Sequence, residues 1–544
     1  MIGEPRSGLV RHAPAALIAL SFLVLLAPFC LIKTPPLTDY PNHLARYWLI
    51  AGGARDPVLA RFYQVDWSNA VTNIGVDRLI ALFSPLASGF VLGRIAIIAS
   101  AVLPPLGMFS LSYAVSRRIT PWQVIFPFAA WSTTFLMGFI NFQIGLGLAL
   151  LFASVDPLAQ PRLWRWVMWM RVPFGLILAV DHLFALIFYA ILLAGLGLGP
   201  APFLADAWRD RSRRLFRAGL TAAWCLIPLA ILAGPSQALP GAQPSAPINL
   251  PANLGALLFS AATDKLATLL SPLASYNFFQ ECTIVLALAG FWIWLNRRGA
   301  LTAHGGLMVA FAGMAALAVF APGRLAGASW VDRRFPIMAL CCVMAALQFR
   351  PGISKRFGII AGCLALSLVI LQTTWVGWNW WNMKEETKAV EDVLSNVPAG
   401  AAILPMQHQP SFLVRSRAPA GRYMYLVGDP TFRHMDAMAV TQRRAFVPNL
   451  FSARGLQPLR VLGSWDGLVE HNGGDLASVS ALSRPPRPGD PAYVGGWRGR
   501  FDYVLVLNAD LPDWAGPFRP PPELRLVADR GFAQLWRVAR RSKP

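Results

Sequence analysis

A carboxylate and an imidazole stand four residues apart in the first polar stretch of the chain, which reads Thr38-Asp-Tyr-Pro-Asn-His-Leu-Ala-Arg46. On a helix, Asp39 and His43 project from one face, within reach of one ligand or metal ion. A carboxylate in such a place can remove a proton from a hydroxyl group as a general base. A structural role fits equally well, because Asp is a good helix N-cap and Pro41 is tolerated in a first turn.

Arginines later in the chain offer positive charge for a phosphate group. Arg333 and Arg334 follow Asp332 in a short polar segment, and a guanidinium group can bind phosphate oxygens through two parallel hydrogen bonds. The alternative is that Asp332 pairs with a neighbouring arginine. Arg94 lies inside an apolar run of helical length, where a charge needs a partner or an aqueous cavity, so it is another candidate phosphate contact.

Asp181 and His182 form a further polar pair in apolar surroundings. His182 is a candidate substrate contact in the cavity of Asp39, and it can equally cap a helix or bind a neighbouring carbonyl group. Near the C-terminus, the segment Arg433-His-Met-Asp436 and Asn449 place polar groups close to apolar runs. No GxSxG, HExxH or phosphate-binding glycine motif assigns them a reaction.

The composition restricts the elements that can carry these residues. Of the 544 residues, 55% are hydrophobic and only 14% are charged, which indicates a membrane protein rather than a soluble enzyme or a disordered chain. The formal net charge of +21 does not indicate nucleic-acid binding, because the basic residues form short clusters between apolar segments and do not alternate with aromatic residues. The six cysteines lie in or beside apolar segments, without a CxxC motif, and are expected to be buried thiols.

Scanning for runs of about 20 apolar residues predicts about eleven transmembrane helices. The predicted spans are residues 13–32, 89–113, 121–137, 139–155, 165–180, 183–200, 216–233, 276–295, 301–321, 335–349 and 358–378. With this number of spans, the basic clusters between helices fall on the cytoplasmic side together with the N-terminus. The first span lacks a small-residue cleavage site and is expected to remain as an anchor.

An odd number of spans places the chain after residue 383 outside the cytoplasm. We therefore expect a transmembrane domain over 1–383 and an extracytoplasmic α/β domain over 384–544. In the latter, a helix is predicted at 385–396 and a mixed sheet from the apolar runs 401–406, 423–427, 503–507 and 524–539.

Two outer loops interrupt the transmembrane domain. Loop 33–88 contains amphipathic pieces near 42–54 and 56–66, which are expected to lie along the membrane surface. Loop 234–275 begins rich in proline and then becomes amphipathic. The inner loops are short and basic, so any chemistry is expected on the outer face.

This layout resembles the glycosyltransferase C superfamily, the membrane glycosyltransferases that use polyprenyl- or dolichyl-phosphate-linked sugars. The shared features cover the whole chain: an N-terminal anchor, an acidic residue opening a long outer loop, many spans and a C-terminal extracytoplasmic domain. Three stretches, 39–46, 138–147 and 443–451, look like those of uncharacterised bacterial multispan proteins of this kind. The outer turn 133–141 departs from the superfamily pattern because it lacks a second acidic residue, which argues against a two-acid metal site.

The resemblance implies that a sugar is transferred from a polyprenyl-phosphate donor to an envelope glycan or lipid acceptor, on the outer face of a bacterial inner membrane. Asp39 would be the base, with His43 as its orienting residue. Arg333 and Arg334 would hold the phosphate, and Arg94 and His182 would contact substrate. A divalent metal is left open, with Asp39 and His43 as its ligands. The alternatives are a glycan or lipid transporter of the flippase kind and a non-catalytic envelope assembly protein.

Overall fold

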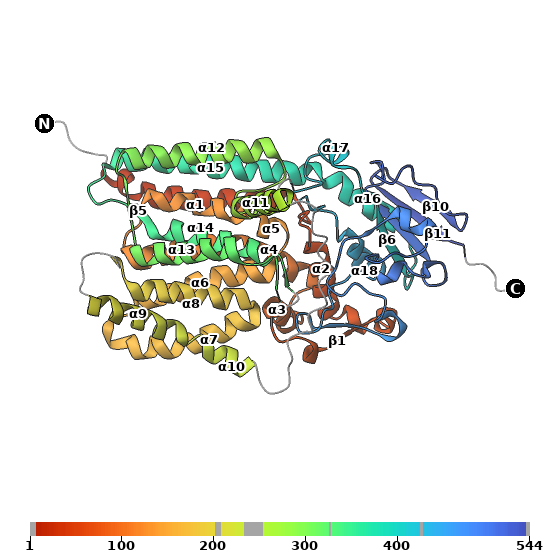
Figure 1. The fold of residues 1–544 in the computed structure, drawn as a ribbon, viewed down its shortest axis with the longest axis horizontal. Helices are drawn as coiled ribbons and strands as arrows, with labels where there is room; N and C mark the ends of the chain where they lie inside the picture. The colour runs from red at the N-terminus through yellow and green to blue at the C-terminus, as the bar shows by residue number, and fades with distance from the viewer. Residues whose placement is uncertain (1–6, 202–207, 233–253, 326–327, 425–427, 540–544) are drawn as a thin grey trace. The chain divides into compact units, whose positions relative to one another are not determined.

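The computed structural model describes residues 7–201, 208–232, 254–325, 328–424 and 428–539 (Figure 1). The chain forms two compact units, and each is assembled from segments that are distant in sequence. Unit 1 contains Met1–Leu31 and Ile97–Gly377, and unit 2 contains Ile32–Ala96 and Trp378–Pro544.

Unit 1 is built from helices. They are α1 (Ser7–Leu31), most of α4 (Gly89–Ser116), α5 (Thr133–Leu136), α6 (Ile140–Leu158), α7 (Trp164–Asp181), α8 (Leu183–Leu198), α9 (Trp208–Ala223), α10 (Leu226–Leu232), α11 (Leu254–Leu270), α12 (Phe278–Arg297), α13 (Gly305–Phe320), α14 (Phe335–Ala346) and most of α15 (Lys355–Asn382). Among the described residues, 6 helical segments are long and apolar enough to cross a membrane, and α8 and α13 are shorter apolar helices. These helices and the apolar composition indicate a membrane protein.

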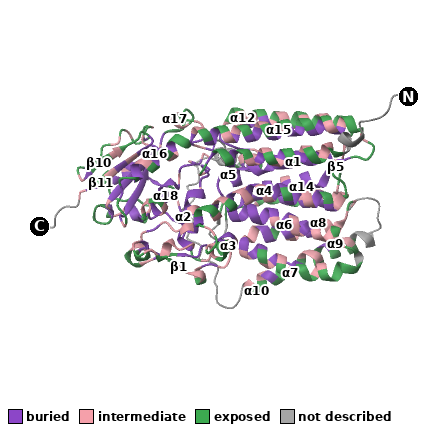
Figure 2. Cartoon of the chain, turned by 180° about the vertical axis from the view of Figure 1, so that it is seen from behind, coloured by how far each residue is buried: buried purple, intermediate pink, exposed green. Residues whose placement is uncertain are grey.

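The burial pattern of unit 1 fits an apolar environment outside the protein (Figure 2). Helix α6 is central, with 67% of its most apolar window buried, whereas only 17% of the corresponding window of α12 is buried. Large apolar side chains such as Leu286 and Ile293 of α12 are therefore exposed. Exposed apolar faces on long helices are expected where lipid is the solvent.

The segment predicted as a span at 121–137 differs from a regular α-helix. It forms a 3₁₀ helix, η4 (Pro121–Trp131), followed by the short α5. Pro127 lies inside η4 and lacks the N–H that an α-helix would use at this point. Thr120 and Gln123 form a capping box at its start. The composition correctly predicts an apolar segment at 121–137, but the prolines determine its backbone geometry.

The predicted span at 216–233 is also divided, between α9 and α10. Pro228 explains the break, because its ring clashes with the carbonyl group four residues earlier, which belongs to Trp224. The turn at Trp224 and Cys225 separates the two helices.

Glycines allow two helices of unit 1 to approach closely. A Cβ atom on Gly147 of α6 would lie 2.4 Å from the backbone of Leu103 in α4. One on Gly145 would lie 2.6 Å from an Asp181 carboxylate oxygen. Only glycine fits at these positions, as is common where membrane helices pack tightly.

Unit 2 contains a five-stranded mixed sheet. Its strand order is β10 (Leu524–Asp529), β11 (Ala533–Val538), β9 (Tyr503–Leu507), β6 (Ile403–Gln407) and β8 (Ala477–Ser478). Strand β6 is parallel to β8 and β9, whereas the β9–β11 and β11–β10 pairs are antiparallel. Helix α16 (Lys384–Leu394) packs against β10 and β11. The predicted helix corresponds to α16, and the runs 401–406, 503–507 and 524–539 correspond to β6, β9, β10 and β11. In the predicted run 423–427, Tyr423 forms an isolated bridge to Pro430 outside the sheet, Met424 lies in no strand, and residues 425–427 lie outside the described residues.

The segment of the predicted first outer loop belongs largely to unit 2, which contains Ile32–Ala96 together with Trp378–Pro544. Strand β1 (Tyr63–Val65) pairs antiparallel with β7 (Leu459–Val461). The Tyr63 hydroxyl donates to the carbonyl oxygen of Val447 over 2.9 Å and accepts from the N–H of the same residue over 3.1 Å. These contacts join the loop to the C-terminal region.

The two amphipathic pieces of this loop do not form the expected surface helices. The first becomes α2 (Tyr40–Ile50), which is buried along most of its length and packs against α18 (Met438–Arg443). Its polar face is buried because Arg46 is paired with Asp77 of α3 (Gly75–Phe83). The second piece, 56–66, consists of a 3₁₀ turn and strand β1. In loop 234–275, residues up to 253 lie outside the described part of the chain, and α11 follows.

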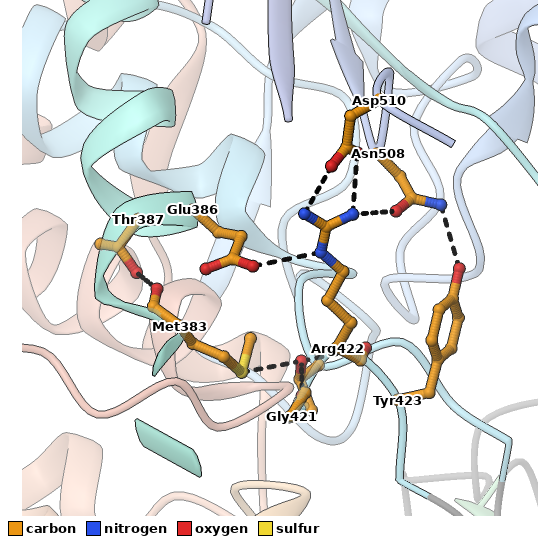
Figure 3. A network of polar contacts seen from close by, with 9 residues as sticks. Met383, Glu386, Thr387, Gly421, Arg422, Tyr423, Asn508 and Asp510 are labelled. Atoms are coloured by element: carbon orange, nitrogen blue, oxygen red, sulfur yellow. Dashed lines mark hydrogen bonds and ion pairs between the residues drawn. The ribbon is translucent and has the colours of Figure 1, made fainter. Parts of the chain in front are cut away.

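A buried network holds α16 to the loops of unit 2 (Figure 3). Arg422 donates from Nε to Glu386 of α16 over 3.1 Å and forms a two-pronged pair with Asp510, over 2.7 and 2.6 Å. It also donates to the side-chain oxygen of Asn508, whose amide in turn donates to the Tyr423 hydroxyl. The guanidinium group, only 4% exposed, therefore links the helix to the turn after β9.

The six cysteines are all unpaired, and Cys225, Cys341 and Cys342 are buried. The expectation of buried thiols therefore holds for these three cysteines, whereas Cys282 is partly exposed. Cys30 and Cys363 are exposed on apolar helices.

Candidate active site

Asp39 stands at the N-cap position of α2, but its side chain makes no capping hydrogen bond. Its backbone carbonyl accepts from the N–H of His43 over 3.0 Å and begins the helix. Pro41 occupies the first turn, as the sequence predicts. The side chain of Asp39 therefore does not serve as the N-cap of this helix.

The carboxylate of Asp39 lies against an imidazole of the C-terminal region. The Oδ1 atom is 3.5 Å from Nε2 of His434, which immediately precedes the 3₁₀ turn Met435–Ala437. The His434 side chain is 1% exposed and that of Asp39 is 15% exposed. Asp39 is therefore the member of the pair that solvent or a substrate can reach.

Two asparagines surround the other side of the His434 ring. The side-chain nitrogen of Asn42 lies 3.5 Å from Nδ1, and that of Asn449 lies 3.4 Å from it. Asn42 is on α2, one turn after Asp39, so the first loop supplies both a carboxylate and an amide to the site. Two of the three stretches that carry the resemblance, 39–46 and 443–451, therefore meet in unit 2.

His43 packs with aromatic residues. Its ring stacks on Tyr47 at 6.0 Å and is tilted against Phe451 at 5.3 Å between centroids. Phe451 also contacts the His434 ring, edge-on at 5.1 Å. Over the described residues, no group of three or more His, Cys, Asp or Glu residues could hold a metal ion.

Asp436, two residues after His434, is fully enclosed. Neither carboxylate oxygen has a hydrogen-bond partner among the described residues that meets normal geometry. Burial raises the pKa of this carboxyl group to about 8, and the backbone N–H groups of Asp436 and Ala437 offset only part of that effect. Asp436 is therefore protonated at neutral pH and adds no negative charge beside the site.

Arg94 binds backbone carbonyl groups. Its Nη1 atom donates to Lys33 over 2.7 Å and to Ile32 over 3.4 Å. These carbonyl groups follow the C-terminus of α1, where unsatisfied acceptors are expected. A charged residue within an apolar run was expected to need a partner, and Arg94 finds that partner in the backbone at the end of α1.

Arg334, in unit 1, is largely committed to its own surroundings. Its Nη1 donates to the carbonyl oxygens of Ser329 and Trp330, over 2.6 and 2.9 Å. Its guanidinium carbon lies 4.8 Å from the Phe139 ring centroid and 5.1 Å from that of Phe184. These contacts account for the charge without a phosphate group.

Arg333 is less enclosed by strong contacts. It stacks over the Trp330 ring at 4.3 Å and makes a long ion pair of 3.4 Å with Asp264. Asp332, predicted as a possible partner for the arginines, instead accepts from Lys265 over 2.9 Å. The side chain of Arg333 is 11% exposed, whereas that of Asp264 is 60% exposed.

His182 caps α8, which was one of the two roles left open by the sequence. Its Nδ1 atom accepts from the N–H of Phe184 over 3.3 Å, and its ring lies edge-on to Phe142. Asp181, at the end of α7, is buried against Gly145. His182 and Asp181 belong to unit 1, whereas Asp39 and His434 belong to unit 2.

Asn42, His434 and Asn449 had no assigned role in the sequence analysis. The sequence indicates these three residues only weakly, since each is a polar residue inside an apolar stretch. Comparison with known proteins adds no further assignment, because no protein-family model and no curated protein matches the sequence. The case for a function therefore rests on the chemistry of these residues.

Proposed function

We propose that the protein is a membrane glycosyltransferase that moves a sugar from a polyprenyl-phosphate donor to an envelope glycan or lipid acceptor. The observation that carries this proposal is the position of Asp39. This carboxylate opens the first outer loop, as in the glycosyltransferase C superfamily, has no capping bond and is the exposed end of a buried polar cluster.

In the proposed reaction, Asp39 accepts the proton of the acceptor hydroxyl group. The hydroxyl oxygen forms a bond to the anomeric carbon, and the bond from that carbon to the phosphate oxygen breaks. The polyprenyl phosphate leaves with the bonding electron pair. Cationic groups lower the energy of that leaving group, and Arg333 is the candidate among the predicted arginines.

The membrane topology belongs to the same proposal. About eleven spans place the N-terminus in the cytoplasm and unit 2 outside a bacterial inner membrane, with η4 as one irregular crossing. Reporter fusions after residue 298 should give a cytoplasmic signal, and fusions after residue 400 an external one. A cytoplasmic signal after residue 400 would contradict the topology.

Purified protein in liposomes provides the direct test of the activity. The probes are polyprenyl-phosphate-linked hexoses and pentoses, and the measured product is free polyprenyl phosphate in the presence of membrane glycan extract. We expect release by the wild type and its loss in Asp39→Asn. Absence of release with every donor, from a folded protein, would count against the transferase.

A lipid or glycan transporter is the second candidate, because unit 1 buries a charge pair. Arg171 of α7 pairs with Asp156 of α6, and both lie within apolar helices. Buried charges of this kind often mark transport pathways. Movement of a fluorescent polyprenyl-phosphate sugar across liposomes, without product formation, would favour this function. Asp156→Asn should then stop movement, whereas Asp39→Asn should not.

A further inference from the structure

The side-chain amide of Asn42 has a fixed orientation. Its oxygen accepts from the backbone N–H of Phe451 over 2.9 Å, and its nitrogen donates to the carbonyl oxygen of Asn449 over 2.8 Å. If the amide were reversed, its NH₂ group would face the N–H of Phe451, and its oxygen would face the carbonyl oxygen of Asn449. The NH₂ group therefore points toward His434, and its second hydrogen is directed to the ring at Nδ1.

This orientation determines which ring nitrogen of His434 carries hydrogen. A neutral imidazole has one donor and one acceptor nitrogen. Nδ1 faces the amide nitrogens of Asn42 and Asn449, which can only donate, so Nδ1 is the acceptor. Nε2 then carries the hydrogen and directs it at Oδ1 of Asp39, 3.5 Å away.

The charge state of His434 agrees with this assignment. Burial and the neighbouring positive charge of Arg433 hold the pKa of His434 well below its usual range. The charged groups that face the ring are Arg433 and Asp39, since the carboxyl group of Asp436 is protonated at neutral pH. His434 is therefore a neutral donor next to a carboxylate.

We propose that His434 is a positioning residue for Asp39, with its tautomer set by Asn42 and Asn449. The Nε2–H group lies 3.5 Å from Oδ1 and would hold this oxygen once the contact shortens on substrate binding, which would turn the other oxygen toward the acceptor. The catalytic part of this inference rests on the proposed transferase function, whereas the tautomer does not. The same tautomer argues against His434 as the base that takes the acceptor proton. Its acceptor nitrogen, Nδ1, faces two amide groups, and its other nitrogen, Nε2, already carries hydrogen.

The contact of 3.5 Å is longer than the usual 2.9–3.0 Å, and Nε2 makes no hydrogen bond of normal geometry among the described residues. Catalytic hydrogen bonds often stay long until substrate is bound. A neutral donor suits the task better than an arginine would, because a full positive charge would lower the basicity of Asp39 much more strongly.

The tautomer is measured by nitrogen NMR of the full-length protein in lipid nanodiscs, labelled with ¹⁵N in histidine only. His434→Gln identifies the His434 signals by their loss. We expect a neutral ring with hydrogen on Nε2 at pH 7. Hydrogen on Nδ1, or a charged ring at pH 7, would overturn the inference.

Asn42→Asp tests the cause, because it replaces an amide donor with an acceptor. The hydrogen should move to Nδ1, or the ring should become protonated. Asn396→Asp, at an exposed asparagine after α16, should leave the His434 signals unchanged. An unchanged His434 spectrum in a folded Asn42→Asp protein would refute the role of Asn42, and the wild-type spectrum still decides if that variant fails to fold.

The catalytic consequence is tested by two substitutions of His434. His434→Leu should lower kcat by roughly 10- to 100-fold with little change in KM, the size expected when a reacting group is misplaced by about 1 Å. His434→Gln retains an N–H donor and should recover part of this loss. Full activity in folded His434→Leu would end the positioning role. If folded Asp39→Asn is fully active, the role of Asp39 as the base fails, and absence of release by the wild type would contradict the transferase proposal. The tautomer measurement stands in both cases.

Discussion

Substitution of Asp39 should affect chemistry and leave folding almost intact. The side chain caps no helix, and the carboxylate is partly exposed. Arg46, whose positive charge Asp39 also attracts, keeps the buried Asp77 as its main partner. We therefore expect Asp39→Asn and Asp39→Ala to lower the free energy of unfolding by about 1 kcal/mol at most, because the carboxylate lies beside the buried His434 ring but caps no helix.

The expected effect on the transfer rate is much larger. Without the carboxylate, the acceptor hydroxyl group keeps its proton while it attacks, and loss of a general base typically slows a reaction by about 10² to 10⁴. This corresponds to roughly 3–5 kcal/mol in the activation barrier. Asparagine and alanine should be equally inactive, because neither accepts the proton. Protein abundance after solubilisation and polyprenyl phosphate release are measured on the same samples.

Asp66 provides a matched control in the same loop, because its side chain accepts from the N–H of Ser68 over 3.0 Å and caps a 3₁₀ turn. Asp66→Ala should lower the free energy of unfolding by about 1 kcal/mol and leave the transfer rate unchanged. A normally abundant and fully active Asp39→Asn protein would refute the catalytic role. Loss of abundance in both Asp39 variants would restore the structural interpretation.

Three further substitutions probe the buried charges. Arg422→Met should lower the free energy of unfolding by about 3 kcal/mol in denaturant titration, because it leaves two carboxylates without their cation, whereas exposed Arg417→Met should change little. The wild type should lose thermal stability as the pH rises from about 4 to 8. The reason is that the unfolded chain releases the Asp436 proton at a lower pH than the folded chain does. Asp436→Asn should remove this pH dependence of the stability. Arg334→Leu should reduce abundance by removing contacts to carbonyl groups and phenylalanine rings, and unchanged abundance would show that these contacts contribute little.

Local features of the fold were predictable from the sequence because local physics determines them. The helix α16 and the strands β6 and β9 follow from apolar periodicity, and the apolar runs agree with the helices of unit 1. The exception at 121–137 was also visible in principle, because Pro121 and Pro127 exclude backbone N–H donors. Apolar composition alone predicts a regular span at 121–137, because it carries no information on these missing N–H donors.

The candidate site was only half predictable, because its contacts are long-range. Asp39 could be identified as a carboxylate opening a polar loop. Its neighbour His434 could not, because no local pattern relates groups as distant as Asn42 and His434, which are 392 residues apart in the chain. Surface helices were expected in the first loop because the partners that bury α2 are equally distant in sequence.

The discontinuity of unit 2 has a consequence for biosynthesis. Residues 32–96 emerge from the ribosome before the remaining membrane helices, while β7, α18 and Asn449 have not yet been made. The Arg46–Asp77 pair can form early, since both residues lie in this segment, but β1 has an open edge and Tyr63 has no partner at that stage. The segment must therefore be protected until translation is nearly complete. Nascent chains halted before β7 should engage chaperones or proteases at β1, and the contacts of Asn42 and Asp39 with Asn449 and His434 can form only after those residues have been made.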